Sequence, residues 1–205
     1  MLIKVNKHLL NILFNAKAKE FKIFALLLCA LTYSPLPSIA ERGEVISNKT
    51  KVTFLGNSNF HSFRGKIEKL SGFIYGDSKD VKSINYLQLE FDPLSFVTKN
   101  IARDENLKRM FQVDSNPIIT FRSTNVLVSH DKAYADITGR LTINRITRRI
   151  NFTAHLNKYG KKGIRAKGKF TIKLSDFKLR PPAPAFIRVN NLVNVEFNAV
   201  ASWYN

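Results

Sequence analysis

The chain has 205 residues and a formal net charge of +18, because 33 lysines and arginines outnumber 15 aspartates and glutamates. Cys29 is its single cysteine, which excludes an intramolecular disulfide and a zinc site built from several cysteines. The excess of positive charge favours anionic partners such as lipid headgroups, lipopolysaccharide or nucleic acid, although a merely solvated basic surface would give the same composition.

The first forty residues have the features of a targeting segment. Five lysines lie within residues 4–22, before an apolar run that covers residues 23–31. A small-x-small sequence then ends at Ala40. This is the order of a basic region, an apolar region and a cleavage site. The apolar run is too short to span a bilayer core of about 30 Å, and an uncleaved anchor is the alternative. We therefore expect residues 1–40 to be a signal peptide cut near Ala40, and the protein to be periplasmic or secreted.

Residues 41–205 are expected to form a single domain, since their number suits one hydrophobic core. The first forty residues carry five lysines and one glutamate, so the formal net charge of the remainder is +18 less +4, or +14. Cleavage would also remove Cys29 and leave no thiol for metal binding or nucleophilic chemistry.

Most of this domain alternates apolar and polar residues between short turns rich in Gly, Asp and Pro. This alternation predicts β-strands with one apolar face. The predicted strands lie within residues 51–54, 65–72, 87–91, 117–128, 132–143, 150–156, 164–174 and 193–203. Eight such strands in simple succession favour an antiparallel meander that closes into a barrel and so has no open edges.

A short helix is predicted between the third and fourth strands, over residues 100–111. Ile101, Leu107 and Phe111 lie near one helical face. Asn100 can cap the start of the helix, and Pro117 cannot continue it. We expect this helix to close one end of the barrel.

Several short motifs follow one another in a recognisable order. They are Ser95 and Thr98, Arg103-Asp104 with Leu107, the run from Pro117 to Thr124, and the run from Thr138 to Thr147. In this order and spacing the chain resembles the YceI-like family of bacterial secreted proteins, over roughly residues 51–202. Asn144 and Arg145 depart from the family pattern, which often has a residue followed by Gly, and Asn116 replaces a common aromatic residue.

The resemblance implies an all-β, eight-stranded antiparallel lipocalin-like barrel that binds a long isoprenoid-type lipid without chemistry. Inward Gly139 and Ala154 suggest that the barrel leaves room for a ligand, whereas a solid barrel filled by phenylalanines is the alternative. The residues expected to contact the lipid are Phe54, Phe91, Leu107, Phe111, Phe121, Leu141, Phe152, Phe170, Phe177 and Phe186. Arg103 and Asp104 are expected at the mouth, where they fix the helix or contact a head group.

Residues 175–190 interrupt the alternation with several prolines and apolar residues, Phe177 and Phe186 among them. A loop of this length is often functional. It is interpreted either as a lid on the barrel or as a simple crossover.

The sequence contains no recognisable catalytic or metal-binding motif. The domain's histidines, His61, His130 and His155, have no partner at a ligand spacing. We therefore expect no catalytic residue, metal or cofactor other than a bound lipid, and a non-enzymatic role in binding, sequestering or transporting a polyprenyl or quinone-like lipid. Two alternatives are nucleic-acid or anionic-surface binding by the basic exterior, and an enzyme acting on an apolar small molecule in the cavity, with His61, Arg103 and Asp104 as its candidates.

Overall fold

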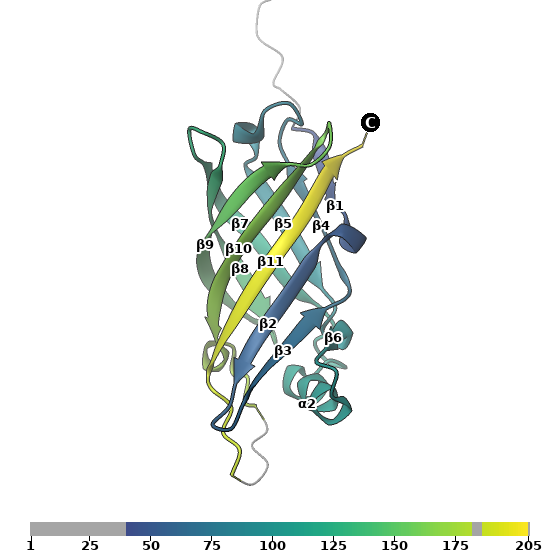
Figure 1. Cartoon of the computed structure of the whole chain (residues 1–205), viewed down its shortest axis with the longest axis vertical. Coiled ribbons are helices and arrows are strands. Elements are labelled where there is room, and N and C mark those ends of the chain that lie inside the picture. The colour runs from purple at the N-terminus through teal and green to yellow at the C-terminus, as the bar shows by residue number, and fades with distance from the viewer. Residues whose placement is uncertain (1–39, 182–185, 205) are drawn as a thin grey trace, which may run out of the picture. The chain divides into compact units, whose positions relative to one another are not determined.

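The computed structural model describes residues 40–181 and 186–204, so all but the last residue of the predicted signal peptide lies outside the described part. The strands form a closed antiparallel β-barrel with one short α-helix at one end (Figure 1). Within these ranges, no helix has the length and apolar character needed to cross a membrane.

Most elements follow the predicted strands, but the predicted strand of residues 65–72 is divided between β3 and β4, and β6 was not predicted. The strands are β1 Arg42–Val45, β2 Lys51–Asn57, β3 Ser62–Ile67, β4 Leu70–Tyr75, β5 Tyr86–Phe91, β6 Phe96–Val97, β7 Ile119–Val128, β8 Tyr134–Ile143, β9 Ile146–Lys158, β10 Gly163–Lys173 and β11 Leu192–Trp203. The helix α2 covers Ile101–Phe111, and the short 3-10 turns are η1 Ser47–Lys49, η2 Val81–Ser83, η3 Pro93–Ser95 and η4 Leu174–Phe177.

Eleven strands occupy eight positions around the barrel. One edge of β11 pairs with β10, and its other edge pairs with β2 near the start of β11 and with β1 near its end. In turn β3 pairs with β2, and β4 pairs with β1. Next, β6 pairs with β3 and β5 pairs with β4. Since β1 and β2 share one position, β3 and β4 the next, and β5 and β6 the one after that, the ring closes with eight positions, as predicted. The interruption at η1 and the strand β1 before it were not predicted.

The helix α2 is fixed to the barrel by side chains at its start. The Asn100 side chain accepts a hydrogen bond from the Arg103 amide at 2.9 Å, which confirms the predicted N-cap. One carboxylate oxygen of Asp104 accepts from both the amide and the hydroxyl of Thr98, at 2.8 and 2.6 Å. Gln112 ends the helix in the left-handed region, with φ of 51°.

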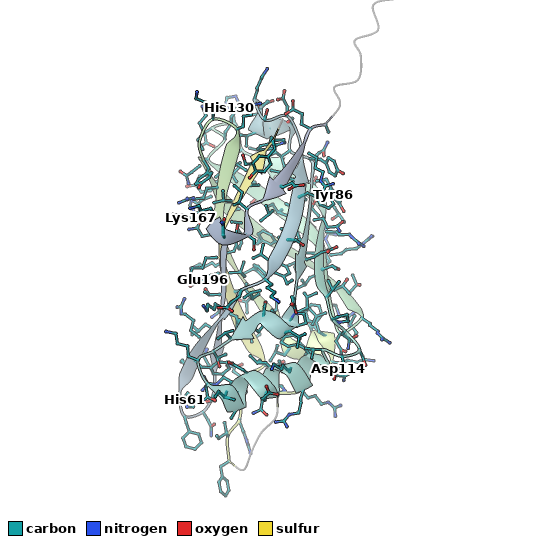
Figure 2. All side chains as sticks on the ribbon, turned by 90° about the vertical axis from the view of Figure 1, so that its right-hand side faces the viewer. His61, Tyr86, Asp114, His130, Lys167 and Glu196 are labelled. Atoms are coloured by element: carbon teal, nitrogen blue, oxygen red, sulfur yellow. The ribbon has the colours of Figure 1, made fainter. Side chains whose placement is uncertain are left out.

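The opposite end of the barrel is filled by Trp203. Its side chain is 3% exposed, and the indole N–H donates to the carbonyl of Gly76 at 3.0 Å. Gly43 lies opposite in the register, where an added Cβ would meet the indole at 3.0 Å. Figure 2 shows His130 at the end remote from α2, and His61 and Asp114 at the end where α2 lies.

The turn between β8 and β9 accommodates the unusual pair Asn144 and Arg145. Both residues have positive φ, 50° and 60°, as a two-residue turn of type I′ requires. The Arg145 guanidinium donates to the carbonyl of Ser115 at 3.0 Å, just beyond α2. This contact joins the turn to the end of the barrel that α2 covers.

Candidate functional site

The barrel encloses an apolar cavity of about 400 Å³. All eleven strands and α2 contribute to its wall. Phe152, Phe170 and Phe197 line the cavity and are only half-buried, although they lie on the inner face of their strands. The size and the apolar wall are those of a small-molecule pocket.

Eight of the ten residues predicted to contact a lipid lie in this wall. They are Phe54, Phe91, Leu107, Phe111, Phe121, Leu141, Phe152 and Phe170. Phe152 stacks on Phe170 with ring centroids 5.2 Å apart, so residues from adjacent strands form one continuous apolar surface. Their contact with a ligand stays a prediction.

The structure places Phe177 and Phe186 outside the wall. Phe177 is 2% exposed and belongs to the packed core. Phe177 lies in η4, which packs against β9. The pairing between β9 and β10 ends at the pair Ala154–Gly168, so η4 takes the place of β10 beside this part of β9. Phe186 is 86% exposed and is not among the residues that line the cavity. The local apolar composition that suggested both residues does not indicate which way each side chain faces.

The inward glycines make room for phenylalanine rings and do not themselves enlarge the cavity. Gly65 lies directly opposite Phe54, and Gly168 lies directly opposite Phe197. In each pair the position of a glycine Cβ is taken by the partner's ring. The Phe121 ring covers Gly139 in the same way. The rings therefore lie flat along the wall, and the centre of the barrel stays open.

Polar residues of the wall gather at the end that α2 covers, which we call the mouth. These residues are Ser58, His61, Asn100, Arg103 and Asn106, and Thr50 is the one polar wall residue elsewhere among those described. Arg103 is the one charged side chain in this wall. Its guanidinium lies over the Phe63 ring at 4.4 Å and 3.3 Å from His61 Nε2. Stacking on Phe63 holds the cation at the edge of the apolar space.

Asp104, predicted beside Arg103 at the mouth, does not line the cavity. Its carboxylate is used in the two hydrogen bonds to Thr98 that hold α2. Adjacent helical residues face different directions, so the Arg103-Asp104 pair divides into one cavity residue and one anchor.

The last residues of the predicted loop of residues 175–190 lie at the mouth, and residues 182–185 lie outside the described part of the chain. Residues 186–190, which we call the strap, run antiparallel to the β2–β3 turn. Asn59 accepts from the Arg188 amide at 2.8 Å and donates to the Phe186 carbonyl at 3.0 Å. Ile187 and Val189 point into the cavity. These contacts place the strap at the mouth, and the choice between a lid and a simple crossover stays a prediction.

Thr50 and Ser58 are the hydroxyl residues of the described cavity wall, and the other hydroxyl groups and the shifted ionisable groups lie outside it. The Ser123 hydroxyl accepts from the Leu87 amide at 2.9 Å, and Thr142 bonds Thr147 on the exterior. Three carboxyl or amino groups have shifted pKa values: the Lys132 ammonium lowers the pKa of Asp80, Glu105 raises the pKa of Lys108, and the Ser129 hydroxyl lowers the pKa of Asp131. Among the described residues, no cluster of three His, Cys, Asp or Glu side chains could hold a metal ion.

Sequence reasoning missed several mouth residues. Phe63 lies before the start of the predicted strand of residues 65–72, yet it belongs to β3 and shares the inward parity of Gly65 and Ile67. That parity was available to find it. Asn106 and Ile187 had no such pattern, because their positions depend on how α2 and the strap pack against the barrel.

A family model described as the YceI-like domain matches residues 44–201. A UPF0312 protein of Pseudomonas paraeruginosa is 30% identical over 172 residues, covering 75% of this chain and 88% of its own length. Protein YceI of Salmonella newport is 30% identical over 175 residues, with the same coverage of 75% and 88%.

Two solved structures have the same fold at lower identity. BcnA of Burkholderia cenocepacia has a TM-score of 0.67 at 20% identity, covering 77% of this chain and 99% of that one. A polyisoprenoid binding domain from Saccharophagus degradans, implicated in plant cell wall breakdown, has a TM-score of 0.66 at 16% identity, covering 82% and 100%. The barrel, the family match and the relatives at 30% identity agree, and the chain belongs to the YceI-like family.

Proposed function

We propose that this protein binds one elongated apolar lipid of the isoprenoid type, such as a polyprenyl or quinone-like molecule, and sequesters or carries it without chemistry. The observation that carries the proposal is the apolar cavity of about 400 Å³ inside the barrel. The name of the Saccharophagus degradans neighbour, a polyisoprenoid binding domain, supports the same class of ligand.

Burial of the apolar tail supplies the affinity in this proposal. Each buried methylene contributes about 0.8 kcal/mol, so a few isoprene units offset the cost of immobilising a flexible chain. Tails that differ by one carbon unit are poorly discriminated, by about 1–3 kcal/mol. We therefore propose a carrier that selects for shape and apolar character.

The polar mouth sets the direction in which the ligand lies. The tail extends toward Trp203, and the polar end of the molecule stays beside Arg103 and His61, where the wall offers hydrogen-bond donors. A carbonyl or phosphate oxygen suits the guanidinium of Arg103. A head group at the closed end would leave its oxygens among apolar side chains without partners.

We also propose that the protein acts outside the cytoplasm, after cleavage near Ala40. The basic start and the apolar run of residues 23–31 support this location. A carrier of this kind would shield an apolar lipid from water in an aqueous compartment.

The test is mass spectrometry of an organic extract from the purified native protein, which should contain an isoprenoid-type lipid in near-equal amount to the protein. Ala166 lines the cavity opposite Ala199, and both are small. An Ala166→Phe variant should therefore fill the space and lose the lipid. The control is Lys167→Phe, which adds a ring at the adjacent exposed position, where Figure 2 labels Lys167.

A folded Ala166→Phe protein that keeps its full complement of lipid contradicts the cavity model, as does a wild-type protein that takes up no long-chain lipid in reconstitution. An Ala166→Phe protein that turns out unfolded is replaced by Ala199→Leu, a smaller addition at the facing position. Both variants are checked by circular dichroism before extraction.

A further inference from the structure

Three of the most exposed apolar side chains surround the mouth of the cavity. Phe60 is 67% exposed, Ile101 is 85% exposed and Phe186 is 86% exposed. Each is adjacent in sequence to a residue of the cavity wall. These wall residues are His61, Ala102 and Ile187. We call Phe60, Ile101 and Phe186 the apolar tip.

The apolar tip comes from three separate parts of the chain. Phe60 lies in the β2–β3 turn, Ile101 is the first residue of α2, and Phe186 begins the strap. The hydrogen bond from Asn59 to the Phe186 carbonyl, at 3.0 Å, joins the turn and the strap. Single exposed apolar residues are ordinary on a protein surface. Three that converge on one opening mark a surface that meets an apolar partner.

Positive charge lies near the same end of the barrel. Arg122 in β7 pairs directly with Arg140 in β8, which pairs directly with Arg149 in β9. All three are exposed, and none takes part in an ion pair between described residues. We call them the arginine row. Like charges directly opposite one another on neighbouring strands are destabilising, so this arrangement favours a bound anion.

The β8–β9 turn places the arginine row near the mouth. Arg140 and Arg149 lie three residue pairs from Ile143 and Ile146, which close the turn. At about 3.4 Å per residue the row is about 10 Å from that turn. Asn144 in the turn accepts from the side chain of Asn116, just beyond α2, at 2.9 Å. The turn therefore lies at the end of the barrel that α2 covers.

We infer that the mouth end of the barrel docks on a bilayer surface that contains anionic phospholipids. The apolar tip enters the interface between headgroups and acyl chains, and the arginine row contacts lipid phosphates. Peripheral membrane binding combines buried apolar area with attraction to anionic lipids in this way. A nucleic acid would satisfy the arginines but would leave an aliphatic side chain such as Ile101 in water, so the combination favours the lipid surface.

Docking in this orientation brings the open end of the cavity to the membrane. A bound lipid then passes between bilayer and barrel without crossing water. This step rests on the proposed function, because it needs a ligand in the cavity. Docking on the membrane does not need a ligand, so docking and lipid transfer are measured in separate experiments.

Docking is tested by flotation with vesicles of phosphatidylcholine alone and of phosphatidylcholine with phosphatidylglycerol, using the chain without residues 1–40. The wild type should float with the anionic vesicles only. Changing the arginine row to Gln should weaken that binding on the order of 100-fold, if each arginine contributes as basic residues near anionic membranes do. Changing the apolar tip to Ser should also weaken binding to the anionic vesicles, because less apolar area then enters the interface.

Two control variants carry the same chemical changes away from the mouth. Lys158, Lys161 and Lys162 changed to Gln remove three charges near the β9–β10 turn, which bonds the Trp203 end of β11. Leu127, Tyr134 and Tyr204, which are 60%, 43% and 65% exposed, supply the apolar control when changed to Ser. Both controls should bind anionic vesicles as the wild type does. Equal losses in the mouth variants and their controls overturn the assigned orientation.

Transfer of a fluorescent polyprenol from the protein to vesicles tests the second step. The transfer rate should rise with vesicle concentration and with anionic lipid, and changes in the arginine row should remove the dependence on anionic lipid. A protein that holds the polyprenol but transfers it at a rate independent of vesicles refutes docking and leaves the cavity proposal intact. A protein that never holds it refutes the cavity proposal.

Two other outcomes also refute the inference. One is a dimer in sedimentation that the apolar-tip variant abolishes, since a second copy would then cover the mouth. The other is salt-sensitive binding to DNA that matches or exceeds binding to anionic vesicles, because the arginine row would then serve a nucleic acid.

Discussion

Gly65 determines where the ring of Phe54 lies. All three atoms nearest to a Cβ built on Gly65 belong to that ring, so a side chain at this position would displace it toward the centre of the cavity. Phe54 also packs on Phe96 with ring centroids 5.7 Å apart, which limits the other directions in which it can move. Because residue 65 has no side chain beyond a hydrogen atom, the Phe54 ring can lie against the wall and leave the cavity wide at this level.

A Gly65→Ala variant should remain folded and accept only a thinner or shorter ligand. The displaced group is the end of a flexible side chain, so the change narrows the cavity more than it strains the strand. Gly65→Ala combined with Phe54→Leu should restore binding, because the smaller side chain frees the space. Titration with prenols of increasing length measures the effect, and equal affinities for wild type and Gly65→Ala at every length contradict it.

Asp104 anchors the start of α2 to the barrel through its hydrogen bonds with Thr98. Asp104→Ala removes both hydrogen bonds to Thr98 and should lower the free energy of unfolding by about 1–3 kcal/mol. Asp104→Asn should lower it less, since a single oxygen accepts both bonds and an amide oxygen can replace it.

Urea denaturation measures both changes. Neighbouring Glu105, which forms an exposed ion pair with Lys108, is the control, and Glu105→Ala should cost no more than about 1 kcal/mol. A loss after Glu105→Ala as large as that after Asp104→Ala would show that general helix stability, and not the contact with Thr98, is responsible.

At the scale of elements, alternation predicted the strands well because each has one face toward the cavity and one toward water. It failed where that environment changes. β1 is short and is separated from β2 by η1, so its four residues give no clear period. The strap is held by main-chain bonds to Asn59 and to the β2–β3 turn, and such long-range pairing leaves no local pattern.

The strap gives a prediction at this scale. Asn59→Ala removes the side-chain bonds to the Arg188 amide and the Phe186 carbonyl. Bound lipid should then dissociate several-fold faster, while the midpoint of global unfolding hardly changes, because the strap is a surface segment with few buried contacts.

Stopped-flow release of a fluorescent lipid measures the dissociation rate, and hydrogen exchange should show lower protection at Arg188. Asn194→Ala is the control, since it removes an exposed side-chain hydrogen bond from Thr171 and Asn194 does not line the cavity. Unchanged release from Asn59→Ala would mean that the strap does not limit exit.

At the scale of the whole molecule, the barrel is preceded in sequence by the predicted signal peptide, whose residues 1–39 lie outside the described part of the structure. If residues 1–40 are a signal peptide, the protein isolated from its native compartment should begin near Glu41. N-terminal sequencing checks this directly. A protein that retains residue 1 in the cytoplasmic fraction contradicts export, and the barrel's ligand would then have to come from the cytoplasmic side.

The ligand site was predictable in its side walls and less so at its two ends. Inward parity placed Phe121 and Leu141 because a strand repeats every two residues. The mouth depends on turns and on α2, and the far end depends on the indole of Trp203 reaching Gly76 from another strand. Such tertiary contacts are not encoded in any local period.

The indole of Trp203 has one more consequence. Because that end of the barrel is filled, a molecule that is already bound leaves by the opening through which it arrived, and an incoming molecule cannot displace it from behind. For the proposed ligand, exchange should therefore be sequential: the occupant departs first and the successor follows. Adding more competitor should not raise the observed rate of replacement above the rate at which the bound molecule dissociates by itself. Opening the far end by Trp203→Ala should remove this limit, so that the rate of replacement rises with the concentration of the competitor.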